Sequence, residues 1–325
     1  MPLLWPAAAL ACGLLGPPPR HAWRRVSHPR ASIEPEYVTL DTGVTMQLFH
    51  QPAHASARLG VPPVVFLHGT FHAGWCWAEH WMGHFAARGI ETYALSLRGT
   101  SGTPVEQRAV QVTQHVADVH AFVRARLPPR APPLLVAHSF GGATVLKYLE
   151  AGHAASGAVL LCSVPPSGNG PMTLRFLRRS LRQAFRITRG LAAKSAATSA
   201  DDARALFFDA ALPEARLRQF MPRFQEDSKV SLDIAHFTRN LPSACADAAG
   251  RARWLAGMPA LVLGAEEDFI VDREGVEETA TFLGTSAILL PSLPHDVMLC
   301  TRWEVAADEI ITWIRQQDFA TGGDE

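Results

Sequence analysis

A serine enclosed by small residues directly after an apolar run constrains the fold of this chain more than any other feature. Residues 134–142 read L-L-V-A-H-S-F-G-G, with Ser139 at the sixth position. A serine on a sharp strand-to-helix turn has a strained backbone, so the positions two residues away on either side must be nearly free of side chain. Ala137 and Gly141 meet this requirement, although a glycine is more usual at the first of these positions. The pattern predicts a nucleophile elbow with Ser139 as the candidate nucleophile.

The surroundings of Ser139 favour this interpretation over an ordinary loop serine beside a glycine pair. Residues 134–136 form the short apolar run typical of a buried parallel strand, and the breaker Pro132-Pro133 precedes them. Residues 143–150 contain good helix formers and no proline, as expected for the helix that follows an elbow.

Composition narrows the class of protein. The chain has 325 residues, 48% hydrophobic and 18% charged, which suits one large domain with an insertion. Its 30 basic and 30 acidic residues leave no net field that would attract nucleic acid. The five cysteines contain no C-x-x-C pair and indicate neither a disulfide framework nor a zinc site. We expect no metal and no cofactor.

The first 35 residues differ from the rest of the chain. An apolar stretch over residues 3–15 is followed by three prolines and several arginines, and no acidic residue precedes Glu34. A positive charge that follows the apolar stretch is typical of an organellar transit peptide rather than a secretory signal. The sequence therefore predicts a plastid or mitochondrial location, or a cytoplasmic one if this segment is simply disordered.

The remaining sequence alternates strand and helix patterns. After a hairpin turn at residues 41–43, apolar runs alternate with amphipathic segments, which predicts a doubly wound, mostly parallel α/β sheet. Strands are expected at 38–40, 45–49, 64–67, 90–95, 134–136, 158–162, 260–263 and 286–290, and helices at 75–88, 112–127, 143–150, 273–283 and 303–314. Residues 36–164 and 243–319 then form the core, and residues 165–242 form a helical cap without convincing strands.

Two features of the predicted cap bear on function. Apolar residues recur at helical spacing while arginines line another face of the same segment. This pattern suits an ordinary cap helix with a solvated basic face, or contact with an anionic membrane. Four phenylalanines suggest either a hydrophobic substrate pocket or the cap's own core. The three sets are Leu174, Leu177, Leu181 and Phe185; Arg175, Arg178, Arg182, Arg186 and Arg189; and Phe207, Phe208, Phe220 and Phe224.

A nucleophilic serine needs a histidine as base and a carboxylate that orients it. In a doubly wound sheet with a nucleophile elbow, the acid and then the histidine follow later strands. Asp268 follows the strand at 260–263, and His295 follows the strand at 286–290. We therefore expect Asp268 as the acid and His295 as the base, with the competing acids Glu266, Glu267 and Asp272.

The oxyanion of an acyl-transfer intermediate needs two positioned N–H donors. The residue after the nucleophile, Phe140, supplies one. The loop after the strand at 64–67 supplies the other, with Thr70 preferred and Phe71 as the alternative. Three further polar residues are expected only to support this site: His68 by shaping the loop, His138 by packing or by contacting a residue of the site, and Asp296 by capping a helix.

Taken together, these motifs resemble the α/β-hydrolase superfamily from about residue 38 onward. The run H-G-T-F-H-A-G-W-C-W at 68–77 is similar to the loop of plant methylesterases and hydroxynitrile lyases. The segment H-D-V-M-L at 295–299 resembles the lysophospholipase and monoacylglycerol-lipase branch. The resemblance implies the fold, a catalytic triad and an oxyanion hole, but no single substrate.

The leading hypothesis is a serine hydrolase that cleaves a hydrophobic or lipid-like carboxylic ester through an acyl-enzyme. One alternative is a lyase of the hydroxynitrile type on the same scaffold. The other is a small-ligand receptor with little turnover. The expected partner is a small-molecule ester, with no nucleic acid, and the oligomeric state is not predicted.

Overall fold

The computed structural model describes residues 33–254 and 257–319, which belong to one compact unit. Almost all of the predicted targeting segment, residues 1–35, lies outside the described residues. Within the described ranges, every helix is too short or too polar to traverse a bilayer.

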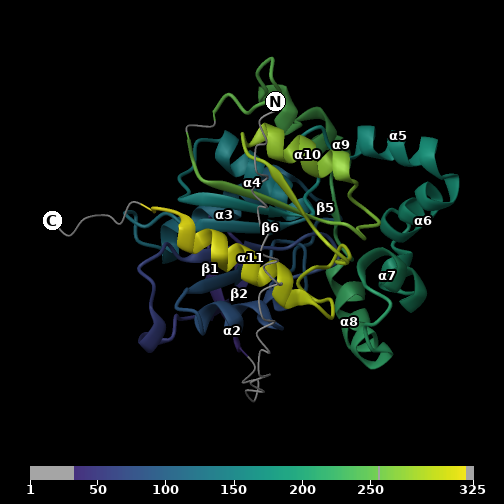
Figure 1. Ribbon diagram of the computed structural model, residues 1–325. Coiled ribbons are helices and arrows are strands. Elements are labelled where there is room, and N and C mark those ends of the chain that lie inside the picture. Colours follow the sequence, from purple (N-terminus) through teal and green to yellow (C-terminus); the bar gives the residue numbers. More distant parts are fainter. Residues whose placement is uncertain (1–32, 255–256, 320–325) are drawn as a thin grey trace, which may run out of the picture. The chain divides into compact units, whose positions relative to one another are not determined.

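An eight-stranded sheet forms the centre of this unit (Figure 1). The first two strands form an antiparallel hairpin, and the second also pairs antiparallel with β4, whereas all other pairs are parallel. This arrangement confirms the predicted mostly parallel α/β class. In spatial order the strands are β1 (Pro35–Thr39), β2 (Thr45–Gln51), β4 (Thr92–Leu95), β3 (Val64–Leu67), β6 (Leu134–His138), β7 (Gly157–Leu161), β9 (Ala260–Ala265) and β10 (Ala287–Leu290).

Helices cover both faces of the sheet, as in a doubly wound fold (Figure 1). α3 (Val112–Arg126) and α4 (Phe140–Glu150) pack together on one face. α2 (Trp81–Ala86) and α11 (Trp303–Gln316) pack together on the other, and α10 (Arg273–Phe282) lies between β9 and β10 in the chain. The innermost strands β3, β6 and β7 are buried along their whole length, which explains their continuous apolar sequences.

The helix predicted over residues 75–88 is wrong as a single element. The chain forms α1 (Trp75–Ala78) and α2, with a break at residues 79–80. At the break, the His80 ring stacks on Trp303 of α11 at 4.8 Å between centroids. Trp77 and Trp81, on either side of the break, both pack against Phe66 of β3. Local periodicity does not report such contacts between distant parts of the chain.

Residues 165–242, predicted as a helical cap, form five helices: α5 (Asn169–Arg179), α6 (Leu181–Leu191), α7 (Ala200–Phe207), α8 (Glu214–Asp227) and α9 (Ile234–Arg239). They gather to one side of the sheet in Figure 1. Short 3-10 turns lie at Ala55–Ala57, Ser195–Ala197 and Pro242–Cys245. The expectation of no strand is wrong, since β8 (Ser231–Leu232) pairs with β5 (Ala109–Val110).

The helical pattern that spans residues 174–189 is interrupted at Ser180. This residue has an extended backbone, with φ −160° and ψ 108°, and its side chain accepts a hydrogen bond from Gln183 N–H at 3.2 Å. Serine is a favoured N-cap, so a new helix begins there. The apolar residues and arginines therefore lie on two successive helices.

The four phenylalanines of this segment form an aromatic cluster. Phe207, Phe208, Phe220 and Phe224 are all buried, with ring centroids 5.7–6.3 Å apart. Their packing favours the interpretation as a core. Only Phe207 also faces the cavity beside Ser139.

Candidate active site

Ser139 lies on the turn between β6 and α4, with φ 54° and ψ −122°. Its N–H donates to the carbonyl of Leu161 on β7 at 3.0 Å, which ties the strained residue to the sheet. Gly141 is required because a Cβ atom there would lie 2.6 Å from the carbonyl oxygen of Leu67. Its helix therefore approaches β3 closely, and Ser139 lies buried at the carboxyl edge of the sheet.

Asp268 and His295 meet at the same edge. His295 Nδ1 lies 2.8 Å from Asp268 Oδ2, and both side chains are almost fully buried. Asp268 Oδ1 accepts hydrogen bonds from the N–H groups of Ile270 and Val271, at 2.7 and 2.9 Å. Since a carboxylate only accepts hydrogen bonds, His295 carries its proton on Nδ1 and leaves Nε2 free to accept one.

Ser139 and His295 line one cavity of about 60 Å³. Among the described residues, no hydrogen bond joins Ser139 Oγ to His295. Such bonds often form only when substrate is bound. The competing acids lie elsewhere, because Glu266 and Glu267 are exposed while Asp272 caps α10 and pairs with Arg175 at 2.7 Å.

Two histidines fix successive peptide groups of the loop after β3. His68 Nδ1 donates to the carbonyl of Gly69 at 2.7 Å, while His68 Nε2 accepts from Leu97 N–H at 3.0 Å. Burial lowers the pKa of His68 to about 3, so this ring is neutral. His72 Nδ1 donates to the carbonyl of Thr70 at 2.8 Å.

The bonds from His68 and His72 to the carbonyls of Gly69 and Thr70 also orient the N–H groups of the same two peptides. In a trans peptide the C=O and the N–H point in opposite directions. The N–H groups of Thr70 and Phe71 thus point away from the two histidine rings. In the described part of the chain, neither these groups nor Phe140 N–H donates a backbone hydrogen bond that would occupy it. Phe71 also has a strained φ of 68°. The loop therefore offers donors next to the elbow, as the oxyanion-hole prediction requires.

Asp296 has a different role from the predicted helix cap. Its Oδ2 lies 2.8 Å from His72 Nε2, and both side chains are buried. Burial alone would lower the pKa of His72, but Asp296 and the Thr70 carbonyl raise it above its ordinary value. Both ring nitrogens of His72 face acceptors, so the ring is an imidazolium paired with Asp296. Sequence reasoning missed this pair; its only signal is an acid directly after the predicted base.

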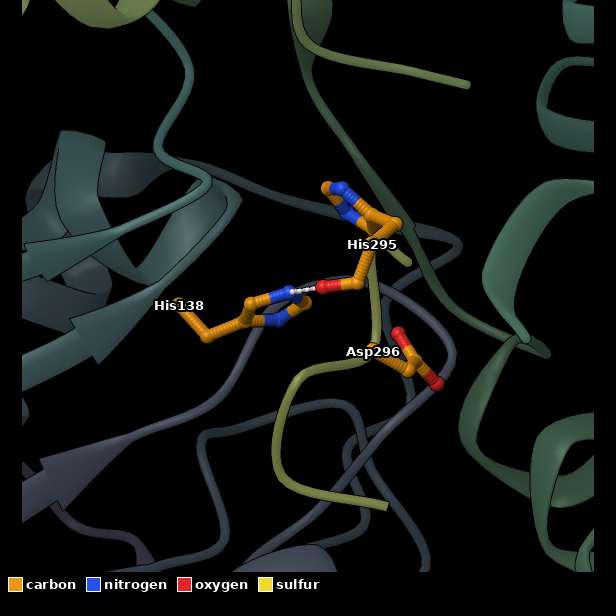
Figure 2. A group of neighbouring side chains, drawn as sticks. All are labelled: His138, His295 and Asp296. Atoms are coloured by element: carbon orange, nitrogen blue, oxygen red, sulfur yellow. Dashed lines mark hydrogen bonds between the residues drawn. The ribbon is translucent and has the colours of Figure 1, made fainter. Parts of the chain in front are cut away.

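His138, which precedes Ser139, connects the elbow to the loop that contains His295. Its Nε2 donates to the carbonyl of His295 at 2.9 Å, while the His295 ring and the Asp296 carboxylate point in different directions (Figure 2). Burial, together with the neighbouring His295 and His72, lowers the pKa of His138 well below its ordinary value. His138 Nδ1 and Asp296 Oδ1 are buried without a hydrogen-bond partner.

Two groups of side chains around His295 have the proximity that a metal ion would need. In each group one candidate ligand atom per residue lies within 4.8 Å of the others. These residues already bond to one another or to neighbouring groups, so a metal would have to displace part of that network. The groups are His138, His295 and Asp296, and Cys162, Asp268 and His295.

A larger cavity of about 450 Å³ is lined in part by the loop after β3. It shares Thr70, His72, Phe140, Asn169 and Leu191 with the small cavity, so the two spaces meet beside the proposed oxyanion donors. Apolar side chains from the core and from residues 165–242 supply much of its wall, including Leu97, Leu191, Val230 and Leu232.

Comparison with known proteins gives a match to one family model, described as the alpha/beta hydrolase family, over residues 64–309. A thermophilic esterase from Thermogutta terrifontis has a similar structure, with TM-score 0.64 and 16% identity over 87% of this chain and 98% of that one. A bromoperoxidase from Bacillus anthracis gives TM-score 0.64 and 14% identity over 87% and 100%. An esterase from Rhodococcus sp. ECU1013 has a TM-score of 0.59 and 16% sequence identity, over 87% of this chain and 98% of the esterase. No curated protein matches the chain in sequence.

Proposed function

The chain belongs to the α/β-hydrolase family, and we propose that it is a serine hydrolase that cleaves carboxylic esters through an acyl-enzyme. One observation carries this proposal: the Asp268 carboxylate, held by two backbone N–H groups, lies 2.8 Å from Nδ1 of His295, which lines one cavity with Ser139. We infer that the His295 proton is on Nδ1, where it can bond to this carboxylate. That arrangement leaves His295 Nε2 to act as a base. The fold alone would not suffice, since a bromoperoxidase shares it.

The proposed reaction has two halves. Ser139 Oγ attacks the acyl carbon and gives its proton to His295 Nε2, while Asp268 stabilises the resulting imidazolium. The N–H groups of Phe140 and Thr70 bind the oxyanion. His295 then protonates the leaving alcohol, and the acyl group stays on Ser139. Water, deprotonated by His295, attacks the acyl carbon of the acyl-enzyme. The bond from this carbon to Ser139 Oγ then breaks, His295 returns the proton to Oγ, and the carboxylic acid leaves.

The volumes of the two cavities support an ester whose two portions, on either side of the scissile bond, differ in size. The space of about 60 Å³ next to Ser139 suits a small group near the scissile bond, and the space of about 450 Å³ accepts a larger apolar portion. We therefore propose a hydrophobic ester as substrate. Esterases and a putative lipase from Acinetobacter baumannii among the similar structures are consistent with this choice.

The test combines labelling with turnover. Wild-type protein should bind a fluorophosphonate probe covalently and hydrolyse nitrophenyl esters, and S139A should do neither. S156A is the matched control, because Ser156 bonds to the Pro132 carbonyl before β7, away from the carboxyl edge of the sheet. Labelling that persists in S139A would refute the assignment. Labelling without turnover would favour the receptor alternative, and cyanide release from hydroxynitriles would favour the lyase.

A further inference from the structure

Four large apolar side chains project from the outer sides of α5 and α6. Leu174 and Leu177 are each 47% exposed, and Leu181 and Phe185 are 71% and 69% exposed. Only three other large apolar residues of the described ranges are comparably exposed, and none of them lies on these two helices. Four exposed apolar side chains on two adjacent helices indicate an interaction surface. We call these four residues, with the arginines described next, the α5–α6 face.

The same two helices are strongly basic. No acidic residue occurs between Glu150 and Asp201. Three arginines of α5 and α6 are neutralised by acids from other elements, since Arg175 and Arg179 pair with Asp272 and Arg189 pairs with Asp202. Arg178, Arg182 and Arg186 are exposed, and within the described residues no carboxylate lies within 4.0 Å of their guanidinium groups. These three charges are therefore available to an external anion.

We propose that the α5–α6 face docks on an anionic lipid surface. Leucine and phenylalanine side chains insert into the boundary between headgroups and acyl chains, and arginines on the same helices pair with lipid phosphates. Apolar insertion and charge pairing together give reversible but stable binding to the membrane, whereas either interaction alone gives marginal binding. The unpaired arginines lie on the same two helices as the exposed apolar side chains, which favours an anionic bilayer over a neutral apolar partner that would leave those charges without counter-ions.

The position of this face relative to the catalytic cavity extends the proposal to the substrate. Met172 and Phe176 of α5 and Ile187 and Leu191 of α6 line the small cavity beside Ser139. The same two helices therefore carry lipid contacts outside and cavity contacts inside, and they lie at the edge of the described unit in Figure 1. A docked molecule would take its hydrophobic ester from the bilayer. This second step rests on the proposed function, whereas the docking itself does not.

Docking is tested by co-sedimentation of the full chain with phosphatidylcholine vesicles, with and without phosphatidylglycerol. We expect binding to the anionic vesicles that weakens in high salt. The triple variant R178Q/R182Q/R186Q should lower the affinity on the order of a hundredfold, as expected for three surface cations. The double variant L181S/F185S should weaken binding to both vesicle types. All variants retain the full chain, so any vesicle binding by another segment contributes equally to the wild type and to the variants.

Matched controls replace exposed residues elsewhere. Y37S removes a 59% exposed aromatic side chain from β1, and R124Q/R218Q removes two arginines that are 66% and 75% exposed. Equal losses in these controls, or no binding of the wild type to anionic vesicles, would overturn the proposal. So would a wild-type dimer that L181S/F185S dissociates, since a second copy would then cover the face. Vesicle binding is measured without turnover, so its failure is separate from failure of the proposed hydrolysis.

Discussion

At the scale of single residues, the orientation of Asp268 decides whether His295 can act as a base. Because Asp268 Oδ1 accepts two backbone N–H groups, an asparagine there would keep its oxygen on that side. Its NH₂ group would then face His295 Nδ1 and force the proton onto Nε2. We expect D268N to keep its fold while kcat for a nitrophenyl ester falls about 10⁴-fold.

The control for D268N is E267Q, which replaces an exposed neighbouring acid and should leave kcat close to the wild-type value. Thermal unfolding of D268N should occur near the wild-type temperature. A loss of activity in E267Q as large as in D268N would mean that Asp268 is not the acid of the triad.

His72 is predicted to position the oxyanion loop through its bond to the Thr70 carbonyl. Asparagine places an N–H near the position of His72 Nδ1, whereas glutamine places one near Nε2, which faces Asp296. H72N should therefore keep the Thr70 contact and H72Q should lose it. We expect kcat of H72Q to lie about tenfold to a hundredfold below that of H72N, because a misplaced donor stabilises the oxyanion poorly.

Both variants remove the imidazolium beside Asp296, but only H72Q keeps an N–H near that carboxylate. A lower kcat in H72Q than in H72N, at similar KM, therefore cannot come from the Asp296 contact and reports the loss of the Thr70 contact. Equal kcat values in H72N and H72Q would show that His72 supports the fold alone.

The placement of Ser139, Asp268 and His295 near one another could be predicted from sequence because each one follows an apolar run that is easy to identify. The pairing of His72 with Asp296 could not. These residues are far apart in the chain, and each lies in a loop whose path depends on the whole sheet. For His138 a supporting contact with the site was one of the two expectations, but its partner, the carbonyl oxygen of His295, could not be predicted for the same reason.

At the scale of elements, close packing of α4 on β3 requires glycine. A Cβ at Gly141 would meet the backbone oxygens of Leu67 and His68, at 2.6 and 2.7 Å, and these atoms have no freedom to move aside. Gly83 of α2 is the matched case, since it is exposed in a helix and a Cβ there meets no atom within 4 Å. We expect G141A to be destabilised by several kcal/mol or to fail to fold.

G83A should instead become more stable, by about 0.5–1 kcal/mol, because alanine loses less backbone entropy in a helix. Urea unfolding of both variants measures the two effects. A G141A protein with wild-type stability would show that α4 is not held as tightly against β3 as described.

The bounds of helices and strands were easier to predict from sequence where the element is more deeply buried. β3 occupies the residues expected, 64–67, because its apolar run has clear ends. The breaks at residues 79–80 and at Ser180 were not predicted, since the apolar spacing continues through both. In the first case a ring contact with α11 accompanies the break, and in the second a serine caps a new helix.

At the scale of the whole molecule, buried histidines dominate the expected response to acid. Burial lowers the pKa of His68 to about 3 and that of His115 to about 4, and it also lowers the pKa of His138 well below 6.5. Below pH 6.5 the unfolded chain gains protons at these positions while the folded chain does not. Stability therefore falls with falling pH, by about 1.4 kcal/mol per pH unit for each histidine, until the folded pKa is reached.

His72 has the opposite sign, because its folded pKa is raised. Its contribution is present below pH 6.5 and is lost as the pH rises through the folded pKa. Burial also lowers the pKa values of His84 and His153, so these two act on the acid side with the three fully buried histidines. His72 acts on the alkaline side, and we expect the greatest stability near neutral pH.

Replacing one histidine whose pKa is lowered by burial tests how these residues affect stability at low pH. His115 Nε2 lies 3.2 Å from the Arg98 carbonyl, and glutamine at this position still offers an N–H donor. We expect the free energy of unfolding of H115Q, measured in urea between pH 6.5 and pH 4.5, to fall less steeply than that of the wild type. The difference should be about 1.4 kcal/mol per pH unit. H54Q, at an exposed site, serves as the control for the substitution itself. Parallel curves for H115Q and the wild type would mean that His115 becomes protonated in the folded protein despite its burial.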